Sequence, residues 1–302
     1  MKIIIIGHIN TVHRQFEESQ TVQTFGGTFS SIAAMAGIAS NEDTIIPVFS
    51  VGHDEYDDVL KECAQFSNIE TKGISLHHGK TDALLLDGKS GKILQNSLAM
   101  VPAVSFGELE PHLKSADAVY VNMQSGFDIT LDTLDHIRLE IRSRRIPLYL
   151  DLHNLTLGFN PDGSRFRRSM SDWRRWCFMT NFVQLSEEEA AGISIEGFTN
   201  ELLAKQMMPL MVKALFITRP NGSVTLFRDA HKSLVQNEIS AAESDAAILP
   251  TDAGNIFGAL FFYFYTKTKN ILQSAETAVK IMTASAKYCE PDKFVRLKEL
   301  AV

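Results

Sequence analysis

Short apolar segments that alternate with amphipathic ones constrain the fold of this chain more than any other feature of its sequence. The first, Ile3–Ile6, is a run of β-branched residues that ends at Gly7, as in a strand buried on both faces of a sheet. Further strand-like segments alternate with helix-like ones and lie at 44–48, 119–122, 147–151, 182–185 and 215–218. This alternation predicts an α/β fold with three α/β/α layers around a doubly wound, mostly parallel sheet.

Two segments, at about 11–25 and 80–98, depart from this alternation and predict a small β-sheet lid. The first is polar with scattered apolar side chains, as in an exposed edge strand or a flap. The second contains two strand-like runs, 81–86 and 92–98, around a glycine-rich turn, which is the pattern of a β-hairpin. The sequence has no linker or internal repeat. We therefore expect a single domain over residues 1–302, with the lid inserted in it.

The composition narrows the choice of partners. The chain is 45% hydrophobic and 22% charged, an ordinary globular balance, and its net charge of −7 argues against a nucleic-acid partner. Arginines are densest between residues 165 and 175, where we expect a solvated patch. No segment reaches the length of a membrane span. Because exposed edges of a lid sheet need to be covered, we expect a homodimer through the lid.

The cysteines predict a reducing location. Cys63, Cys177 and Cys289 are odd in number, lie far apart and show no spacing typical of a disulfide framework or a zinc site. The apolar run at the N-terminus is too short for a signal peptide. Both observations favour the cytoplasm.

The segment 249–259 leads from a turn into the strongly apolar run 260–265 and is a candidate phosphate-binding helix start. Backbone amides at such a start have no intrahelical partner, and the helix dipole favours an anion there. Asp252 places a negative charge in this same turn. The segment is therefore typical of a phosphate site except for one carboxylate.

Five short motifs, in order along nearly the whole chain, resemble those of the ribokinase-like (PfkB) family of sugar and nucleoside kinases. They are Gly7-His8-Ile9-Asn10, Phe25-Gly26-Gly27, Val51-Gly52-His53-Asp54, Ser186-Glu187-Glu188-Glu189-Ala190 and Pro250-Thr251-Asp252-Ala253-Gly254-Asn255. The resemblance implies transfer of the γ-phosphoryl group of ATP, with Mg²⁺, to a hydroxymethyl group of a sugar or nucleoside.

The resemblance also implies roles for individual residues. It places Asn10, Gly26 and Gly27 beside the substrate, and Glu189 where it could orient a magnesium-bound water. It assigns contacts with the nucleotide to Thr218, Gly222 and Thr251. It makes the segment Asp252, Ala253, Gly254 and Asn255 the catalytic loop.

The catalytic loop departs from the family pattern at two positions. Asn255 stands where the family has the aspartate that accepts the proton of the hydroxyl group. An amide cannot accept that proton, although it can orient a hydroxyl, and loss of a base lowers a rate by about 100- to 10,000-fold. Asp252 replaces the first glycine, and its repulsion of a phosphate oxygen about 4 Å away is roughly 4 kcal/mol at an intermediate dielectric.

Three interpretations of Asp252 remain open at this point. It caps the N-terminus of the helix, it serves as a displaced base three residues early, or it marks a site that no longer binds nucleotide phosphates or binds a cation instead.

Polar residues also follow two central strands at the carboxyl edge of the predicted sheet, where ligands bind in such folds. Asp151, His153 and Asn154 follow one strand, and Asn122 and Gln124 follow the strand before it. We expect all five to contact a polar ligand, and His153 could accept a proton at neutral pH. The alternative is that Asp151 caps the next turn and His153 is a surface residue.

Three functions fit these observations. The first is a small-molecule kinase with impaired or altered chemistry. The second is a catalytically inactive protein of the same fold that binds a small ligand or a partner. The third is a structural dimer that needs no chemistry in its pocket.

Overall fold

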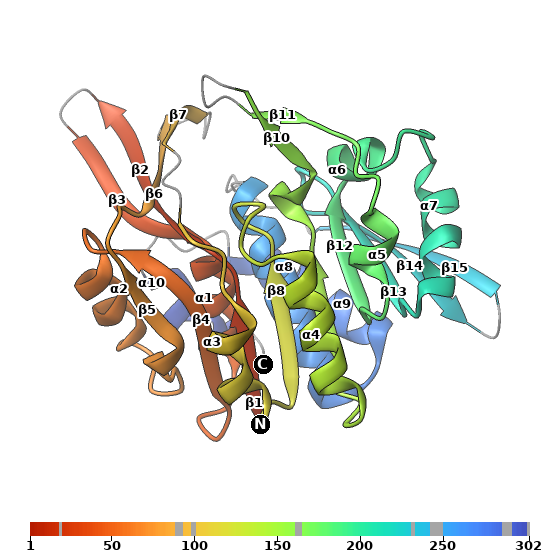
Figure 1. Cartoon of the computed structure of the whole chain (residues 1–302), viewed down its shortest axis with the longest axis horizontal. Coiled ribbons are helices and arrows are strands. Elements are labelled where there is room, and N and C mark those ends of the chain that lie inside the picture. Colours follow the sequence, from red (N-terminus) through yellow and green to blue (C-terminus); the bar gives the residue numbers. More distant parts are fainter. Residues whose placement is uncertain are drawn as a thin grey trace.

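A large, mostly parallel sheet runs through the centre of the molecule (Figure 1). The computed structural model describes residues 1–17, 20–87, 93–97, 101–160, 165–230, 233–241, 250–285 and 292–300. Within them, nine strands lie in the order β15-β14-β13-β12-β9-β8-β1-β4-β5. The strands from β13 to β5 are parallel, and β14 and β15 extend the sheet antiparallel. Their bounds are β1 Lys2–Ile6, β4 Thr44–Gly52, β5 Ile74–His77, β8 Ala118–Asn122, β9 Leu148–Asp151, β12 Phe182–Ser186, β13 Ala214–Thr218, β14 Val224–Ala230 and β15 Ser233–Ile239.

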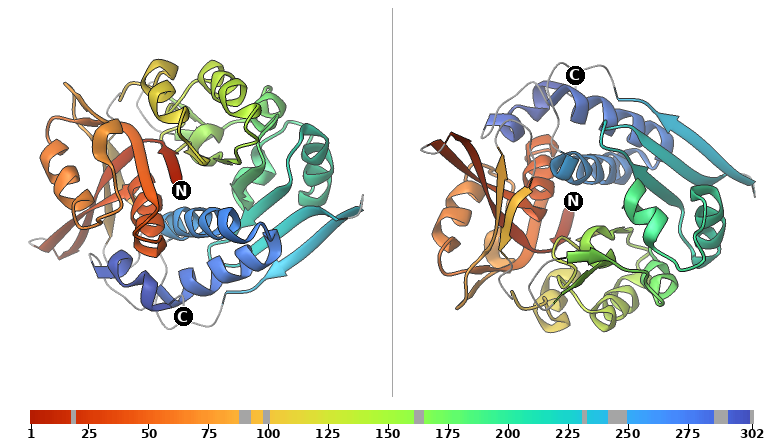
Figure 2. Two further views of the ribbon diagram at one scale, coloured as in Figure 1. Left: turned by 90° about the horizontal axis from the view of Figure 1, so that it is seen from below. Right: turned by 90° about the horizontal axis from the view of Figure 1, so that it is seen from above.

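Helices cover both faces of this sheet (Figure 2). One layer contains α1 Thr28–Ile38, α2 Tyr56–Cys63, α8 Pro250–Thr268, α9 Ile271–Ser285 and α10 Asp292–Val295. The other contains α3 Phe106–Leu113, α4 Leu131–Arg142, α5 Trp173–Cys177, α6 Glu187–Gly192 and α7 Asn200–Met207. The predicted three-layer, doubly wound fold is thus confirmed. No helix within the described residues combines the length and the apolar character needed to cross a membrane.

The central strands supply the core of both layers because their side chains alternate between the two faces. In β1, Ile3 and Ile5 join the core under α1 and α8, whereas Ile4 and Ile6 join the core under α3 and α4. All four are fully buried. The continuous apolar run in the sequence therefore reflects burial on both sides of the sheet.

An aromatic layer joins the central strands to α8. Tyr120 of β8 stacks on Tyr149 of β9 with ring centroids 4.8 Å apart. Phe261 of α8 lies 4.4 Å from the ring of Phe216 and 5.1 Å from that of Phe182. These contacts bury the apolar run that follows the candidate phosphate turn, and they fix the start of α8 over the ends of the strands.

A second sheet of four strands lies beside the large one, in the order β3-β2-β6-β7 (Figure 1). Its strands are β2 Ile9–Glu17, β3 Gln20–Gly27, β6 Asp82–Asp87 and β7 Ile93–Ser97, and we call it the small sheet. β2 pairs antiparallel with β3 and parallel with β6. The prediction of a small separate sheet is confirmed, but the first segment forms two strands instead of a single edge strand.

Several elements were not predicted. The antiparallel strand β15 and the helix α3 lie in stretches whose apolar pattern is short and irregular. A two-stranded hairpin of β10 Leu157–Phe159 and β11 Arg165–Arg167 was also missed. This hairpin follows β9 and reaches over the carboxyl edge of the sheet, where it contributes to the site described next.

Candidate functional site

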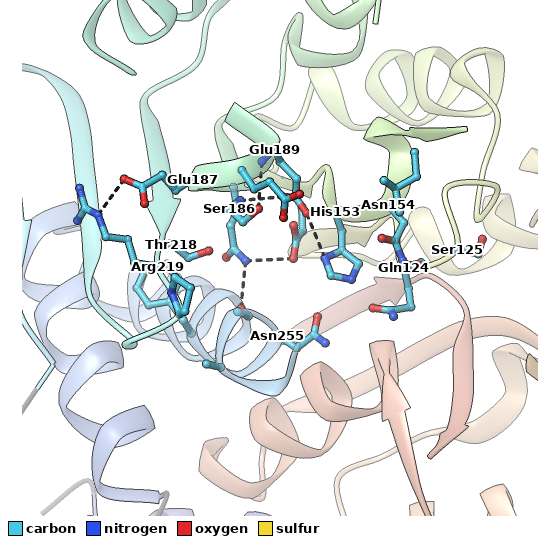
Figure 3. A pocket seen from close by; sticks show the side chains of 18 of the residues that line it. Gln124, Ser125, His153, Asn154, Ser186, Glu187, Glu189, Thr218, Arg219 and Asn255 are labelled. Atoms are coloured by element: carbon cyan, nitrogen blue, oxygen red, sulfur yellow. Dashed lines mark hydrogen bonds and ion pairs between the residues drawn. The ribbon is translucent and has the colours of Figure 1, made fainter. Parts of the chain in front are cut away.

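A cavity of about 970 Å³ lies at the carboxyl ends of the central strands, between these ends and the small sheet (Figure 3). Its position is the one at which doubly wound folds bind ligands, and its volume is large enough for a nucleotide-sized molecule. The structure brings together in its lining eleven of the residues predicted for the site, namely Asn10, Gln124, Asp151, His153, Asn154, Glu189, Thr218, Gly222, Ala253, Gly254 and Asn255.

Gly26 and Gly27 support the cavity from behind without lining it. Gly27 has a φ of 66°, and a Cβ on it would lie 2.7 Å from Cγ of Gln124. A Cβ on Gly26 would lie 2.7 Å from Cγ2 of Val12. Gly27 therefore gives Gln124 room to reach the cavity wall, and Gly26 gives room to Val12, which are packing roles next to the predicted substrate contacts.

Thr251 and Asp252 fall in the first turn of α8, and their side chains lie outside the described part of the structure. Their backbone is already helical, because α8 starts at Pro250. Asp252 is thus inside the helix, and its interpretation as the N-cap is wrong. The other two interpretations of this residue stay predictions.

Asn255 is held by a second amide. Its Oδ1 accepts a hydrogen bond from Nδ2 of Asn122 at 2.7 Å, and its backbone carbonyl accepts one from Oγ of Ser31 at 3.2 Å. Asn122 is fully buried and Asn255 is 2% exposed. The position predicted for the base therefore carries an amide whose oxygen accepts a hydrogen bond within the protein.

Gln184 of β12 was not predicted, yet it connects three elements of the site. Its Nε2 donates to Oδ2 of Asp151 and to the carbonyl oxygen of Gly254, each at 3.1 Å. Its Oε1 accepts from the hydroxyl of Tyr149 at 2.6 Å. The sequence signal for this role was a glutamine within the otherwise apolar run Phe182–Leu185. Buried polar side chains normally have hydrogen-bond partners, so a polar residue in such a run indicates a specific contact.

Two glycines of α8 make room for this glutamine. A Cβ on Gly254 would lie 3.3 Å from Nε2 of Gln184. A Cβ on Gly258 would lie 2.8 Å from Oε1 of Gln184 and 2.6 Å from the hydroxyl of Tyr120. Close packing thus accounts for glycine at position 258, and at position 254 a Cβ would be in tight contact with Gln184.

Asp151 ends β9 and is buried in the cavity wall, 2% exposed. Burial raises the pKa of its carboxyl well above the ordinary value, and the nearby charges of Glu189 and Asp128 act in the same direction. The hydrogen bond from the backbone of His153 opposes this rise in the pKa. Asp151 therefore does both things considered for it, because it holds the following turn and also lines the cavity.

His153 lies in a backbone conformation that is unusual for a side-chain-bearing residue, with a φ of 32°. Burial lowers the pKa of its imidazole, although the carboxylates of Glu189 and Asp128 raise it. Nδ1 of His153 is 3.8 Å from Oε1 of Glu189. It lines the cavity, so its interpretation as a plain surface residue is wrong.

Glu189 forms a capping box at the start of α6. Its Oε2 accepts from the backbone amide of Ser186 at 2.7 Å, and its own amide donates to Oγ of Ser186 at 3.2 Å. This confirms Ser186 as the predicted helix cap. Among the residues that the structure describes, no group of three or more His, Cys, Asp and Glu side chains is placed to hold a metal ion. For a magnesium ion, these residues would supply one carboxylate, that of Glu189, which would hold the ion through a bound water molecule.

The β10–β11 hairpin adds two arginines that we expected in a solvated patch. Arg165 and Arg167 both line the cavity, so that expectation is wrong for them. Arg165 donates to the carbonyl oxygen of Ser125, and Arg167 lies 3.0 Å from the carboxylate of Glu188. The spacing of the arginines did not predict that they line a cavity, because the hairpin that turns these side chains toward it was not predicted.

The turn from Thr218 to Gly222 closes the other end of the cavity. The amide of Gly222, which has a φ of 80°, donates to the carbonyl oxygen of Arg219 at 2.9 Å. Arg219 is 3.3 Å from Glu187 and 2.9 Å from Glu238. Oγ1 of Thr218 donates to the carbonyl oxygen of Leu185 at 3.4 Å. At this end of the cavity, Arg219 is therefore paired with the carboxylates of Glu187 and Glu238, next to the backbone groups of the turn.

The arrangement of sheets and helices is that of the ribokinase fold. A pyrophosphate-dependent kinase in the ribokinase family, solved with sulfate, superposes with a TM-score of 0.74 at 12% identity over 100% of both chains. Ribokinase from Thermotoga maritima superposes with a TM-score of 0.71 at 17% identity, over 99% of this chain and 97% of the other. A ribokinase II from E. coli in complex with ATP and Mg²⁺ gives 0.72 at 14% identity, over 100% and 96%.

The likeness in sequence is much weaker than the likeness in structure. The chain matches no protein-family model and no curated protein. The solved structures therefore establish the fold, and the chemistry has to be argued from the residues of this chain.

Proposed function

We propose that the cavity binds a sugar or nucleoside together with ATP, and that the protein transfers the γ-phosphoryl group to a hydroxymethyl group of that ligand. The observation that carries this proposal is one continuous cavity. Its walls contain both the residues predicted to bind the substrate and the residues predicted to bind the nucleotide. Asn10 and Gln124 lie on one side, and the Thr218–Gly222 turn and the start of α8 lie on the other. The E. coli ribokinase II that was solved with ATP and Mg²⁺ supports the assignment of the donor.

Residues of this chain supply several of the roles that phosphoryl transfer needs. Amide side chains of Asn10, Gln124 and Asn154 suit the hydroxyl groups of a polyol, since each offers both a donor and an acceptor. Arg167 and Arg219 lie at the cavity rim, where guanidinium groups suit phosphate oxygens. Magnesium, when bound, offsets the phosphate charge, and Glu189 would hold it through a water molecule.

The chemistry is slowed at the position of the family's base. Asn255 orients a hydroxyl group but does not take its proton. Without another base, the rate falls by about 100- to 10,000-fold. We therefore expect slow turnover with measurable donor binding.

Two measurements test the proposal. Titration of Mg-ATP by calorimetry should give saturable binding, and a panel of sugars and nucleosides should give ADP release with at least one acceptor. The same panel is run with pyrophosphate, because one structural neighbour is a pyrophosphate-dependent kinase. Turnover with pyrophosphate and not with Mg-ATP would mean that pyrophosphate is the phosphoryl donor. Absence of binding of either donor would contradict the proposal.

A second candidate, a ligand-binding protein without catalysis, is favoured by the Asn122–Asn255 pair. Two buried amides are joined at 2.7 Å where a kinase would place a carboxylate, and Asn255 of this pair lines the cavity. An amide held in this way still suits recognition of a polyol. Thermal stabilisation by a sugar or nucleoside, with no donor binding and no ADP release, would favour this function over the first.

We also propose that the small sheet closes over the ligand as a lid and forms a homodimer interface in a cytoplasmic protein. Its outer strands within the described residues are β3 and β7, and Phe16 and Val22 on β2 and β3 are 38% and 42% exposed. Exposed strand edges of this kind are normally covered. Light scattering at micromolar concentration should give a dimer, and a monomer would contradict this part of the proposal.

A further inference from the structure

A kinase that keeps any activity needs a group to receive the proton of the acceptor hydroxyl, and Asn255 does not serve. Among the residues whose side chains the structure describes, which do not include Asp252, five carboxylates line the cavity, and these are Asp82, Asp151, Glu187, Glu188 and Glu189. Glu187 and Glu188 are 55% and 74% exposed at the rim and face Arg219 and Arg167. Glu189 is engaged in the capping box of α6. Asp82 belongs to the small sheet, across the cavity from α8.

Asp151 differs from the other four in its connection to the catalytic loop. A single amide nitrogen, Nε2 of Gln184, lies 3.1 Å from Oδ2 of Asp151 and 3.1 Å from the carbonyl oxygen of Gly254. Gly254 directly precedes Asn255. Figure 3 shows the side chains of Asn255 and of His153, two residues after Asp151, approaching the same part of the cavity. The carboxylate is thus held beside the position where a base is missing.

We infer that Asp151 is the general base of this site, in place of residue 255, and that Gln184 is its positioning residue. This inference rests on the proposed function. The hydroxyl proton of the acceptor passes to the Asp151 carboxylate while the acceptor oxygen forms a bond with the γ-phosphorus of ATP. The bond from that phosphorus to the bridging oxygen breaks, and its electron pair leaves with ADP.

The electrostatic surroundings raise the proton affinity of Asp151. Asp151 faces Glu189 from α6, Asp128 from the loop after β8, and His153 and Gln184 from η2 (His153–Thr156) and β12. Burial and the two carboxylates raise the pKa of Asp151, so its proton affinity is higher than that of an exposed aspartate. A base is most effective when its pKa lies near the working pH.

The decisive test compares wild type, Asp151→Asn, Asn255→Asp and the double variant. ADP release is measured with Mg-ATP and the acceptor found in the panel. Asp151→Asn should lower kcat by about 100- to 10,000-fold, with Kd for Mg-ATP by calorimetry changed less than about threefold. The double variant should recover activity, because it returns a carboxylate to position 255. Asp229→Asn, at an exposed position on β14, is the matched control and should leave kcat unchanged.

The pH profile supplies a second readout. The acid limb of wild-type kcat/KM should lie well above pH 4, and in the double variant it should change position, because the titrating carboxylate is then at residue 255. Gln184→Met leaves Asp151 in place and should lower kcat and shift the acid limb, which keeps the inference testable if Asp151→Asn does not fold. Full activity of Asp151→Asn would overturn the base assignment and leave the proposed function standing. Absence of turnover in every variant, wild type included, would overturn both.

Discussion

Asn122 donates its side-chain amide to Oδ1 of Asn255 across 2.7 Å, and this bond joins the end of β8 to the first turns of α8. Both side chains are almost fully buried. A carboxylate at position 255 would accept the same hydrogen bond but would add a charge to a buried pair. The amide at position 255 thus makes this buried contact between β8 and α8 without placing a charge there.

Replacing one amide of the Asn122–Asn255 pair should destabilise the folded protein, and replacing the second amide as well should cost less than the first replacement. Asn122→Leu and Asn255→Leu each leave a buried amide without its partner, so each should lower the free energy of unfolding by about 1–3 kcal/mol. The double variant should be less destabilised than the sum of the two, because no orphaned amide remains. Urea denaturation of the four proteins measures this cycle, and strict additivity would show that the two amides are not coupled.

Gly258 should tolerate no side chain. Its Cβ would lie 2.6 Å from the hydroxyl of Tyr120 and 2.8 Å from Oε1 of Gln184. Gly258→Ala should therefore lower the free energy of unfolding by about 1–3 kcal/mol. Gly192 in α6 is the matched control, since a Cβ there meets nothing within 4 Å. Gly192→Ala should be neutral or stabilising by up to about 1 kcal/mol, and equal loss in both variants would contradict the packing argument.

The sequence predicted what depends on local pattern. The run Ile3–Ile6, the helix cap at Ser186 and the apolar segment in α8 are each visible within a few residues of chain, because burial and capping have a fixed period or spacing. The cavity residues at the ends of β8 and β9 followed from the rule that ligands lie at the carboxyl edge of such sheets.

What could not be predicted depends on contacts between distant segments. Gln184 and Gly254 are separated by 70 residues, and only the packing of α8 on β12 brings them together. Arg165 enters the cavity through a hairpin of two three-residue strands, which is too short for a periodic signal. The pairing of β2 with β6 likewise places Asn10 beside Asp82, although β3, α1, β4, α2 and β5 lie between the two strands in the sequence. Such relationships are tertiary and leave little trace in a local pattern.

Asp43 should stabilise the protein most at neutral pH. It is buried and accepts hydrogen bonds from Lys267 at 2.8 Å and Tyr263 at 3.0 Å. Burial alone would raise its pKa, but these bonds outweigh burial, and the pKa lies below the ordinary value. Stability from the ionised form is present above the unfolded-state pKa, near 4, and is lost as pH falls through the folded-state pKa.

Asp43→Asn should therefore lower the free energy of unfolding at pH 7 by about 1–3 kcal/mol, and the difference from wild type should narrow below about pH 4. Denaturation at several pH values checks this. Asp229→Asn, an exposed position, is expected to match wild type throughout. A deficit in Asp43→Asn that does not change with pH would argue against the charged bond as its source.

Cys63 and Cys177 should be unreactive in the folded protein. Both are free and buried, and burial raises the pKa of each thiol to about 12. The thiolate is the reactive species, so little of it exists at pH 8. Treatment with iodoacetamide followed by peptide mass spectrometry should show these two cysteines alkylated only after unfolding. Cys289 lies outside the described residues, and its labelling serves as an internal comparison. Rapid native labelling of Cys63 or Cys177 would contradict their burial.

Asp151 should make the protein less stable as pH rises, which is opposite to the effect of Asp43. Its folded-state pKa is raised well above the ordinary value, chiefly by burial. Below about pH 4 both folded and unfolded states are protonated at this residue, and no penalty exists. As pH rises above that value the unfolded state ionises first, so the free energy of unfolding falls until the pH passes the folded-state pKa.

Asp151→Asn removes this titration, and the variant should gain stability relative to wild type between about pH 4 and neutral pH. Thermal or urea denaturation across that range measures the difference. A gain in stability together with the loss of kcat expected above would show that the buried Asp151 carboxyl destabilises the fold and serves the reaction. A difference in stability that is the same at every pH would mean that Asp151 ionises in the folded state as readily as in the unfolded chain.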